Sequence, residues 1–168
     1  MKVAFIDRDG TINKEYPDEE WRYVNEPILL KDSLEGIIGI RKKGYEIIIV
    51  TNQYLINEGI ITLSQYKTFT ESLIQELVRN GITILDVFYC PHSRDENCDC
   101  IKPKTGLIDM ALERYSEIEL SKSFVAGDSM CDVELGHKLG IRTFGINIKL
   151  QLENYVSVES LLDIIKYL

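Results

Sequence analysis

The sequence of 168 residues has no long hydrophobic run, few cysteines and few prolines. No apolar stretch approaches the roughly 18 residues of a membrane span, and the N-terminal segment reaches Asp7 too soon for a signal peptide. The net charge is −8, which argues against nucleic acid or an anionic membrane as a partner, because both attract cationic surfaces. No repeat, linker or low-complexity segment is present. We therefore expect a cytosolic protein with one globular domain over residues 1–168.

Short apolar runs alternate with segments of helical periodicity along the whole chain. The runs predict buried strands at 3–6, 47–50, 87–89, 124–126 and 143–146. The periodic segments predict helices at 33–43, 63–80, 105–115, 133–139 and 157–168, the second of them preceded by a capping box of Thr62 and Gln65. This alternation predicts an α/β fold, a Rossmann-like parallel sheet with helices on both faces. In such sheets the ligand site lies beyond the carboxyl ends of the strands.

Polar residues occupy the positions where that site should form. Crowded carboxylates repel one another unless a cation neutralises them, and hard oxygen ligands beside phosphate suit Mg²⁺. A hydroxyl and a lysine add a hydrogen-bond donor and a positive charge, as a phosphate pocket requires. The residues that follow the predicted strands are Asp7, Asp9, Thr51, Asn52, Gln53, Lys102 and Asp128, with Asp132 one helical turn later.

Three of the four cysteines lie close together, and the sequence there reads Cys90-Pro91-His92 and then Cys98-Asp99-Cys100. Three thiolates and one imidazole make a complete tetrahedral ligand set for structural Zn²⁺. Because no ligand position is left open, such a zinc would hold the 90–100 loop, which leads directly to Lys102. A disulfide is the alternative, and it would leave His92 and one cysteine unused.

These motifs, in this order, resemble those of haloacid dehalogenase-like (HAD) phosphatases. The resemblance rests on Asp7-Arg8-Asp9-Gly10-Thr11, Thr51-Asn52-Gln53, Lys102-Pro103 and Gly127-Asp128, and it covers roughly residues 1–146. The Cys-Pro-His…Cys-Asp-Cys loop narrows the resemblance to a zinc-loop subgroup. That subgroup contains D-glycero-D-manno-heptose 1,7-bisphosphate 7-phosphatase and the histidinol-phosphate phosphatase domain.

The resemblance implies a role for each matching residue. Asp7 would be the nucleophile that forms an aspartyl-phosphate, and Asp9 the general acid and base. It further implies a Mg²⁺ held by Asp7, the Asp9 backbone carbonyl and Asp128, with Asp132 supporting this shell. Thr51 and Asn52, with Gln53 beside them, would hold the phosphoryl oxygens, and Lys102 would bridge the nucleophile and the phosphate.

The chain departs from the family pattern around this set. Ile101 and Ser129 stand where relatives usually carry a basic residue, and Tyr54-Leu55 stands where they usually have Ser-Gly. Two lost cations would weaken recognition of a second phosphate on the substrate, unless Lys104 compensates. The implied fold has no separate cap domain. We therefore expect the substrate to be enclosed by the 12–31 loop and by the 90–100 loop, called the zinc loop below.

The sequence therefore predicts a phosphomonoesterase that acts on a small phosphorylated sugar or related metabolite. Histidinol phosphate is an alternative substrate, which the acidic segment Asp18-Glu19-Glu20 would tolerate. A non-catalytic phospho-ligand binding module is the alternative from another class, although such a module needs neither Asp7 nor Asp9. The charge of −8 disfavours a polynucleotide substrate. The sequence predicts no particular oligomeric state.

Overall fold

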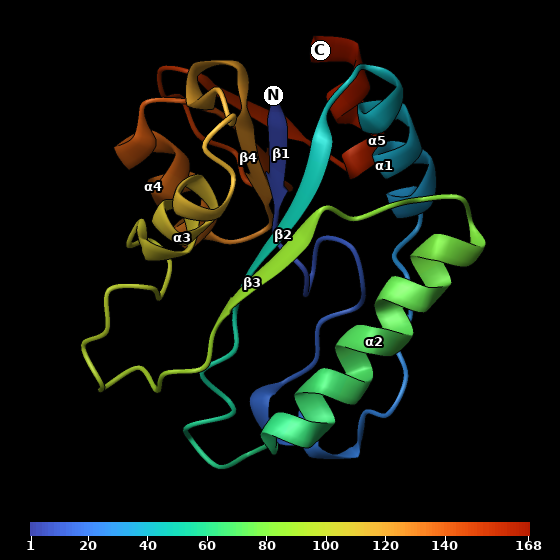
Figure 1. Ribbon diagram of the computed structural model, residues 1–168, viewed down its shortest axis with the longest axis vertical. Helices are drawn as coiled ribbons and strands as arrows, with labels where there is room; N and C mark the ends of the chain where they lie inside the picture. Colours follow the sequence, from blue (N-terminus) through green and yellow to red (C-terminus); the bar gives the residue numbers. More distant parts are fainter.

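The computed structural model describes residues 1–168 and centres on one sheet of six parallel strands (Figure 1). The strand order is β3-β2-β1-β4-β5-β6. The strands are β1 (Val3–Ile6), β2 (Glu46–Asn52), β3 (Asp86–Cys90), β4 (Phe124–Gly127), β5 (Arg142–Ile146) and β6 (Tyr155–Val158). The parallel α/β fold expected from the alternating pattern is thus confirmed.

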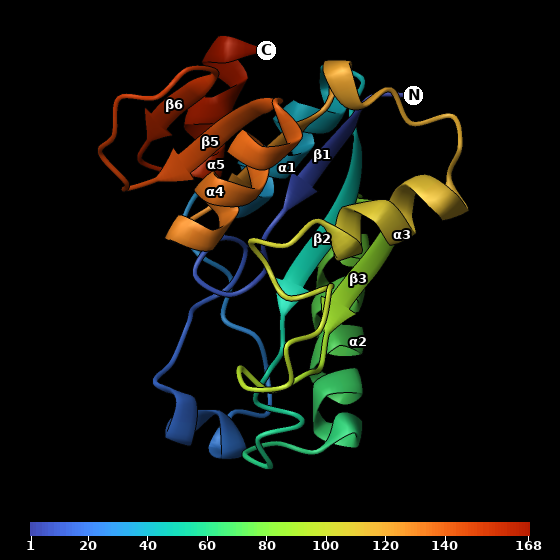
Figure 2. The same ribbon diagram turned by 90° about the vertical axis from the view of Figure 1, so that its left-hand side faces the viewer.

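Helices cover both faces of this sheet (Figure 2). One face packs against α1 (Ser33–Lys42), α2 (Leu63–Arg79) and α5 (Leu161–Ile164), and the other against α3 (Gly106–Arg114) and α4 (Met130–Leu139). Short 3-10 helices are η1 (Asp18–Tyr23), η2 (Leu120–Lys122) and η3 (Ile165–Tyr167). Each face therefore has its own hydrophobic core, of 17 and 13 buried residues.

Local sequence explains why the central elements form. The β-branched run Ile47–Val50 of β2 is completely buried, as a strand covered on both faces requires. Helix α2 begins with the expected capping box, in which the Gln65 backbone N–H donates to the Thr62 hydroxyl at 3.1 Å and Gln65 Oε1 accepts from the Thr62 backbone at 2.8 Å. Such a cap stabilises a helix by about 1 kcal/mol.

The C-terminal segment differs from its prediction. The periodicity predicts a helix over 157–168, but Tyr155–Val158 forms β6, and only Leu161–Ile164 is α-helical before η3. Thr143 to Ile146 of β5 pair with Tyr155 to Val158 in parallel register. The backbone hydrogen bonds offered by the open edge of β5 outweigh a helical pattern that is too short to be decisive. Helix α4 also begins earlier than expected, at Met130.

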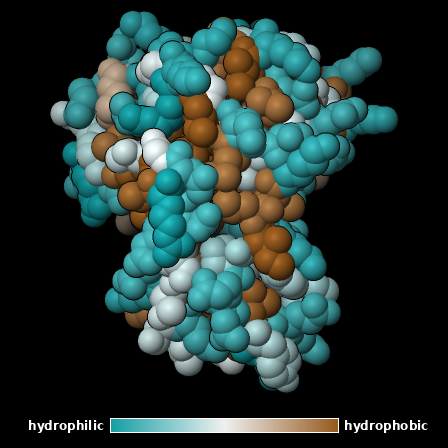
Figure 3. All heavy atoms as spheres, turned by 90° about the vertical axis from the view of Figure 1, so that its right-hand side faces the viewer, coloured by the Kyte–Doolittle hydropathy of each residue, from teal (hydrophilic) through white to brown (hydrophobic).

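Three connecting segments lie beyond the carboxyl ends of the strands, at the opposite end of the molecule from both termini (Figure 1). They are residues 8–32, 53–62 and 91–105, and a small cluster of Trp21, Leu55, Ile61, Tyr66 and Phe69 packs the first two against α2. The face covered by α1 and α2 is mostly hydrophilic, with a narrow apolar band (Figure 3). None of the helices has the length and apolar character needed to cross a membrane.

Candidate active site

The segment after β1 begins with Asp7 and turns at Gly10. Asp7 continues the strand, because its backbone N–H donates to the Ala126 carbonyl at 2.9 Å, and its side chain faces the carboxyl edge of the sheet. Gly10 follows with a φ of +80°, and a Cβ atom there would lie 2.0 Å from Asp128 Oδ2. Glycine is therefore required at position 10 both for the turn and for the close approach of Asp128.

Lys102 lies at the centre of the site. Its side chain is 2% exposed, and Nζ donates to Asp7 Oδ1 at 2.6 Å, to Asp132 Oδ1 at 2.6 Å and to the Val50 carbonyl at 2.9 Å. Burial alone would lower the pKa of Lys102, but the carboxylates of Asp132 and Asp7 outweigh it and raise the pKa above its usual value. Lys102 is therefore a fixed positive charge that touches one oxygen of Asp7.

The motif after β2 holds this arrangement in place. The Asn52 side-chain amide makes two hydrogen bonds with the backbone of Lys102. Oδ1 accepts from the Lys102 N–H at 2.8 Å, and Nδ2 donates to the Lys102 carbonyl at 3.1 Å. The Gln53 amide donates to Asp9 Oδ2 at 2.8 Å and to the Thr51 hydroxyl at 2.9 Å. The proton of the Thr51 hydroxyl thus remains available to a ligand, whereas the Asn52 amide is already committed to Lys102.

A third carboxylate comes from the end of β4. Oxygens of Asp7, Asp128 and Asp132 lie within 4.8 Å of one another and could hold a metal ion. Burial, and then the neighbouring charge of Asp132, raises the pKa of Asp128. The Asp9 carboxylate is not part of this group. Both of its oxygens accept hydrogen bonds from Arg8 instead.

A pocket of about 230 Å³ opens over these residues. Asp7, Asp9, Thr51, Asn52, Gln53, Lys102 and Asp128 all line it, so the structure brings together the residues that the motifs singled out. Asp132 lies beneath the pocket, fully buried, and accepts from both Lys102 and Ser129. Glu15 and Asp18 form an acidic rim of the pocket; Asp18 belongs to the acidic segment noted in the sequence, whereas no sequence feature indicated Glu15.

The zinc loop converges as its spacing predicts. Cys90, His92, Cys98 and Cys100 offer ligand atoms within 4.8 Å of one another, and all four cysteines of the chain are free thiols. The separation of Cys90 Sγ from Cys98 Sγ is 3.5 Å, and that of His92 Nδ1 from Cys100 Sγ is 3.1 Å. Ligands of a tetrahedral zinc at 2.0–2.3 Å lie roughly 3.5–3.8 Å apart. The cluster therefore has the composition of a metal site, and with Cys100 Sγ 2.8 Å from Cys90 Sγ it is more compact than a tetrahedral zinc shell.

Tertiary contacts that no motif signalled join the three segments around the pocket. Arg94 of the zinc loop pairs with Glu58 at 2.6 Å and with Asp18 at 3.3 Å, and its guanidinium stacks 4.3 Å from the Tyr54 ring centre. The Tyr54 hydroxyl donates to Asp18 at 2.9 Å, and burial together with this bond raises the pKa of Tyr54 to about 12. Tyr54, Leu55 and Asp18 all line the pocket, so the departure from Ser-Gly shapes its wall.

The other residues that depart from the family pattern, Ile101 and Ser129, lie in different parts of the structure. Ser129 lines the pocket, whereas Ile101 packs against the core between the sheet and α3. Lys104 turns away from the pocket, and Nζ donates to Asn97 Oδ1 at 3.1 Å and to the Cys98 carbonyl. Lys104 thus braces the zinc loop, and Lys102 is the one lysine or arginine side chain that lines the pocket.

Comparison with known proteins places this site in a family. The family model described as polynucleotide kinase 3 phosphatase matches residues 2–154. A probable D-glycero-D-manno-heptose-1,7-bisphosphate 7-phosphatase of Thermoplasma volcanium is 41% identical over 131 residues, which are 76% of this chain and 86% of that protein. The D-glycero-alpha-D-manno-heptose-1,7-bisphosphate 7-phosphatase of Photorhabdus laumondii is 39% identical over 152 residues, covering 84% and 79%.

Other relatives widen this picture. The histidine biosynthesis bifunctional protein HisB of Campylobacter jejuni is 34% identical over 147 residues, which are 84% of this chain and 40% of that protein. The crystal structure of D,D-heptose 1,7-bisphosphate phosphatase from B. bronchiseptica, complexed with magnesium and phosphate, shares the fold with a TM-score of 0.87 at 22% identity, covering 99% and 97% of the two chains. With its motifs gathered at one pocket, this chain belongs to the polynucleotide kinase 3 phosphatase family and is a phosphatase of the HAD superfamily.

Proposed function

We propose that the protein hydrolyses the phosphomonoester of a small phosphorylated sugar through an aspartyl-phosphate on Asp7. The observation that carries this proposal is the convergence of Asp7, Asp9, Thr51 and Lys102 on one pocket at the carboxyl edge of the sheet. A binding module would need the positive charge and the hydroxyl, but it would need neither a nucleophile nor an acid. The names of the heptose-bisphosphate relatives support a sugar as the leaving group.

The contacts within the pocket support a role for each of these residues. Lys102 occupies Oδ1 of Asp7, which leaves Oδ2 to attack phosphorus while the bond from phosphorus to the sugar oxygen breaks. Asp9 gives its proton to that departing oxygen. In the second step Asp9 takes a proton from water, the water oxygen bonds to phosphorus, and the bond from Asp7 breaks. Thr51 and Lys102 stabilise the charge on the phosphoryl oxygens in both steps.

Mg²⁺ fits the cluster of carboxylates that includes the nucleophile Asp7. Asp7, Asp128 and the backbone carbonyl of Asp9 would hold it, and Asp132 would support it from below. Burial and mutual repulsion raise the pKa of Asp128, and a divalent cation relieves such repulsion. When bound, the ion neutralises charge on the phosphoryl group.

Zn²⁺ fits the cluster of Cys90, His92, Cys98 and Cys100 in a structural role. The four ligands fill a tetrahedral shell and leave no position open for water. The backbone of the zinc loop leads directly into Lys102, and its outer part reaches the pocket rim through Arg94. A bound zinc ion would therefore fix the position of Lys102 relative to Asp7, and also the position of the pocket rim.

Histidinol phosphate is the second candidate substrate. Glu15 and Asp18 line the rim of the pocket, where a cationic leaving group would lie, and the HisB relatives act in histidine biosynthesis according to their name. The same two carboxylates disfavour a polynucleotide, because they would repel its backbone phosphates. The substrate is thus a small phosphomonoester whose leaving group is neutral or cationic.

Release of inorganic phosphate from a panel of phosphorylated sugars and histidinol phosphate, with Mg²⁺ and Zn²⁺ present, tests this proposal. We expect turnover of at least one small monoester and none by Asp7→Asn. Borohydride reduction of quenched protein should convert phosphorylated Asp7 to homoserine, which mass spectrometry detects. Release without modification of Asp7 would exclude the covalent route, and no release from any monoester would exclude the function.

A further inference from the structure

Arg8 is a buried cation to which the reaction described above assigns no role. Its side chain is 2% exposed and is among the largest fully buried side chains of the protein. Nε donates to Asp9 Oδ1 at 2.9 Å, Nη2 donates to Asp9 Oδ2 at 2.8 Å, and Nη1 donates to the Thr70 hydroxyl at 3.0 Å. A buried charge is costly unless it is paired, so this fork has a specific partner in Asp9.

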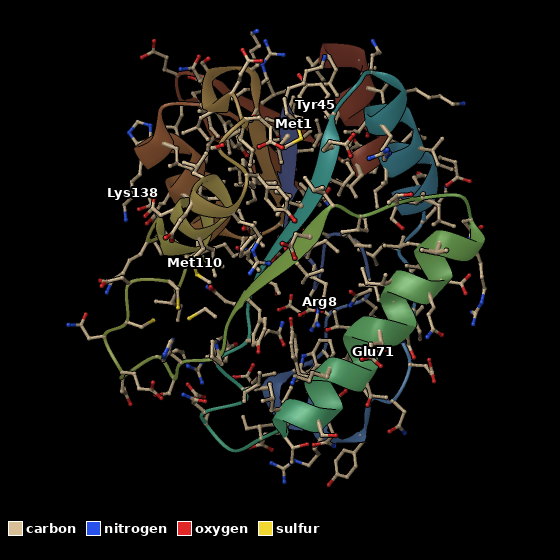
Figure 4. All side chains as sticks on the ribbon, in the orientation of Figure 1. Met1, Arg8, Tyr45, Glu71, Met110 and Lys138 are labelled. Carbon is tan, nitrogen blue, oxygen red and sulfur yellow. The ribbon has the colours of Figure 1, made fainter.

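Aromatic rings determine where the Arg8 guanidinium lies. Its carbon is 4.9 Å from the ring centre of Phe69, 5.3 Å from that of Tyr66 and 5.8 Å from that of Trp21. Figure 4 shows Arg8 between the sheet and α2, the helix that supplies Tyr66, Phe69 and Thr70. Cation–π attraction to the three rings favours this position of the guanidinium.

The Asp9 carboxylate is held in turn by this guanidinium. Oδ1 accepts from Arg8 and from Asn13 Nδ2 at 2.9 Å, and Oδ2 accepts from Arg8 and from Gln53 Nε2 at 2.8 Å. Bidentate pairing fixes the plane of a carboxylate as well as its distance. Gln53 lines the pocket, and its amide also donates to Thr51. The bond from Gln53 to Asp9 Oδ2 is therefore the one that a proton or a substrate oxygen can replace, while Arg8 keeps the plane of the Asp9 carboxylate.

We propose that Arg8 is a positioning residue that aims the Asp9 carboxylate at the leaving-group oxygen. The inference rests on the proposed function, in which Asp9 passes its proton to that oxygen as the phosphorus–oxygen bond breaks. Without the fork, the Asp9 carboxylate would keep only the single bonds from Asn13 and Gln53, which fix its plane less firmly than a bidentate pair. A well-oriented proton transfer contributes about 10²–10⁴-fold to such a step. The competing explanation is that Arg8 only ties α2 to the loop after β1.

Two substrates separate these explanations. p-Nitrophenolate leaves without a proton, whereas the alkoxide of a sugar phosphate needs one. In Arg8→Met we expect the steady-state rate on the best sugar phosphate to fall by about 10²-fold or more. The first turnover with p-nitrophenyl phosphate, followed as release of p-nitrophenolate, should stay within about threefold of the parent protein. Arg8→Lys keeps the charge without the fork, so it should show the same selective loss even if the methionine variant unfolds.

Thr70→Val is the matched control, because it removes the bond from Arg8 to α2 and leaves the bonds to Asp9. Its rates on both substrates should stay within about threefold of the parent. Equal losses on the two substrates in the Arg8 variants, or the same selective loss in Thr70→Val, would overturn the role of Arg8. Absence of turnover on both substrates in the parent protein would instead overturn the proposed function on which that role depends.

Discussion

An arginine at position 129 should create a preference for bisphosphates that the natural chain lacks. Lys102 is the pocket's one cation from a lysine or arginine, and Asp7 and Asp132 already bind it. Arg94 is paired at the rim, and Lys104 is bound within the zinc loop. The natural protein therefore offers no free cation to a second phosphate, and its acidic rim would repel one.

The magnitude follows from the contact that Ser129→Arg would add. A hydrogen bond to a charged group contributes about 1.5–3 kcal/mol. That energy corresponds to roughly 10–150-fold in kcat/KM for a substrate with the second phosphate. The substitution also removes the Ser129 hydroxyl from the N-terminus of α4, where it donates to Asp132. Loss of such a cap costs about 0.5–2 kcal/mol of stability.

Heptose 1,7-bisphosphate and heptose 7-phosphate are a suitable substrate pair, because they share the bond to be cleaved and differ only in the second phosphate. We expect the ratio of their kcat/KM values to be near or below one in the natural chain and to rise in Ser129→Arg. Ser129→Gln, which loses the same cap without gaining charge, should leave the ratio unchanged. A strong preference of the natural chain for the bisphosphate, unaltered by the arginine, would refute this account of the pocket.

Three further predictions address the nucleophile, the zinc loop and the turn after β1. Asp7→Asn should lower kcat by more than about 10³-fold, since an amide cannot replace the nucleophile, and should keep a cooperative thermal transition; turnover within tenfold of the parent would contradict the covalent route. Cys98→Ser, or removal of zinc by a chelator, should lower the melting temperature more than the activity of each folded molecule, and elemental analysis should find zinc in protein prepared without chelators. Gly10→Ala should displace Asp128, with which its Cβ would collide, and should raise the Mg²⁺ concentration for half-maximal activity by about tenfold or more. An unchanged Mg²⁺ requirement would show that Asp128 tolerates the shift.

Much of the site was predictable because its residues follow strands. A buried apolar run can be identified from local sequence, and parallel strands present their carboxyl ends at one edge of the sheet. Asp7, Thr51 and Asp128 each come directly after such a run or end one, so their meeting follows from the fold class alone. The spacing of the cysteines likewise predicted the cluster, since its members are at most 10 residues apart.

The contacts that refine the site come from residues far apart in the chain. Arg8 bonds to Thr70 across 62 positions, Asn52 bonds to Lys102 across 50, and Arg94 bonds to Glu58 across 36. Nothing in the local pattern specifies these partners, because they depend on how α2 and the loops pack beneath the sheet.

By itself, then, the sequence determined the α/β class, the strand-end motifs and the composition of the metal cluster. These properties depend on periodicity and on short spacing. Only the tertiary structure decided that Asn52 holds a backbone, that Lys104 faces the zinc loop and that Tyr155–Val158 extends the sheet. The physical reason is that a side chain takes the partner, and a short segment the hydrogen bonds, that the packed fold places within reach.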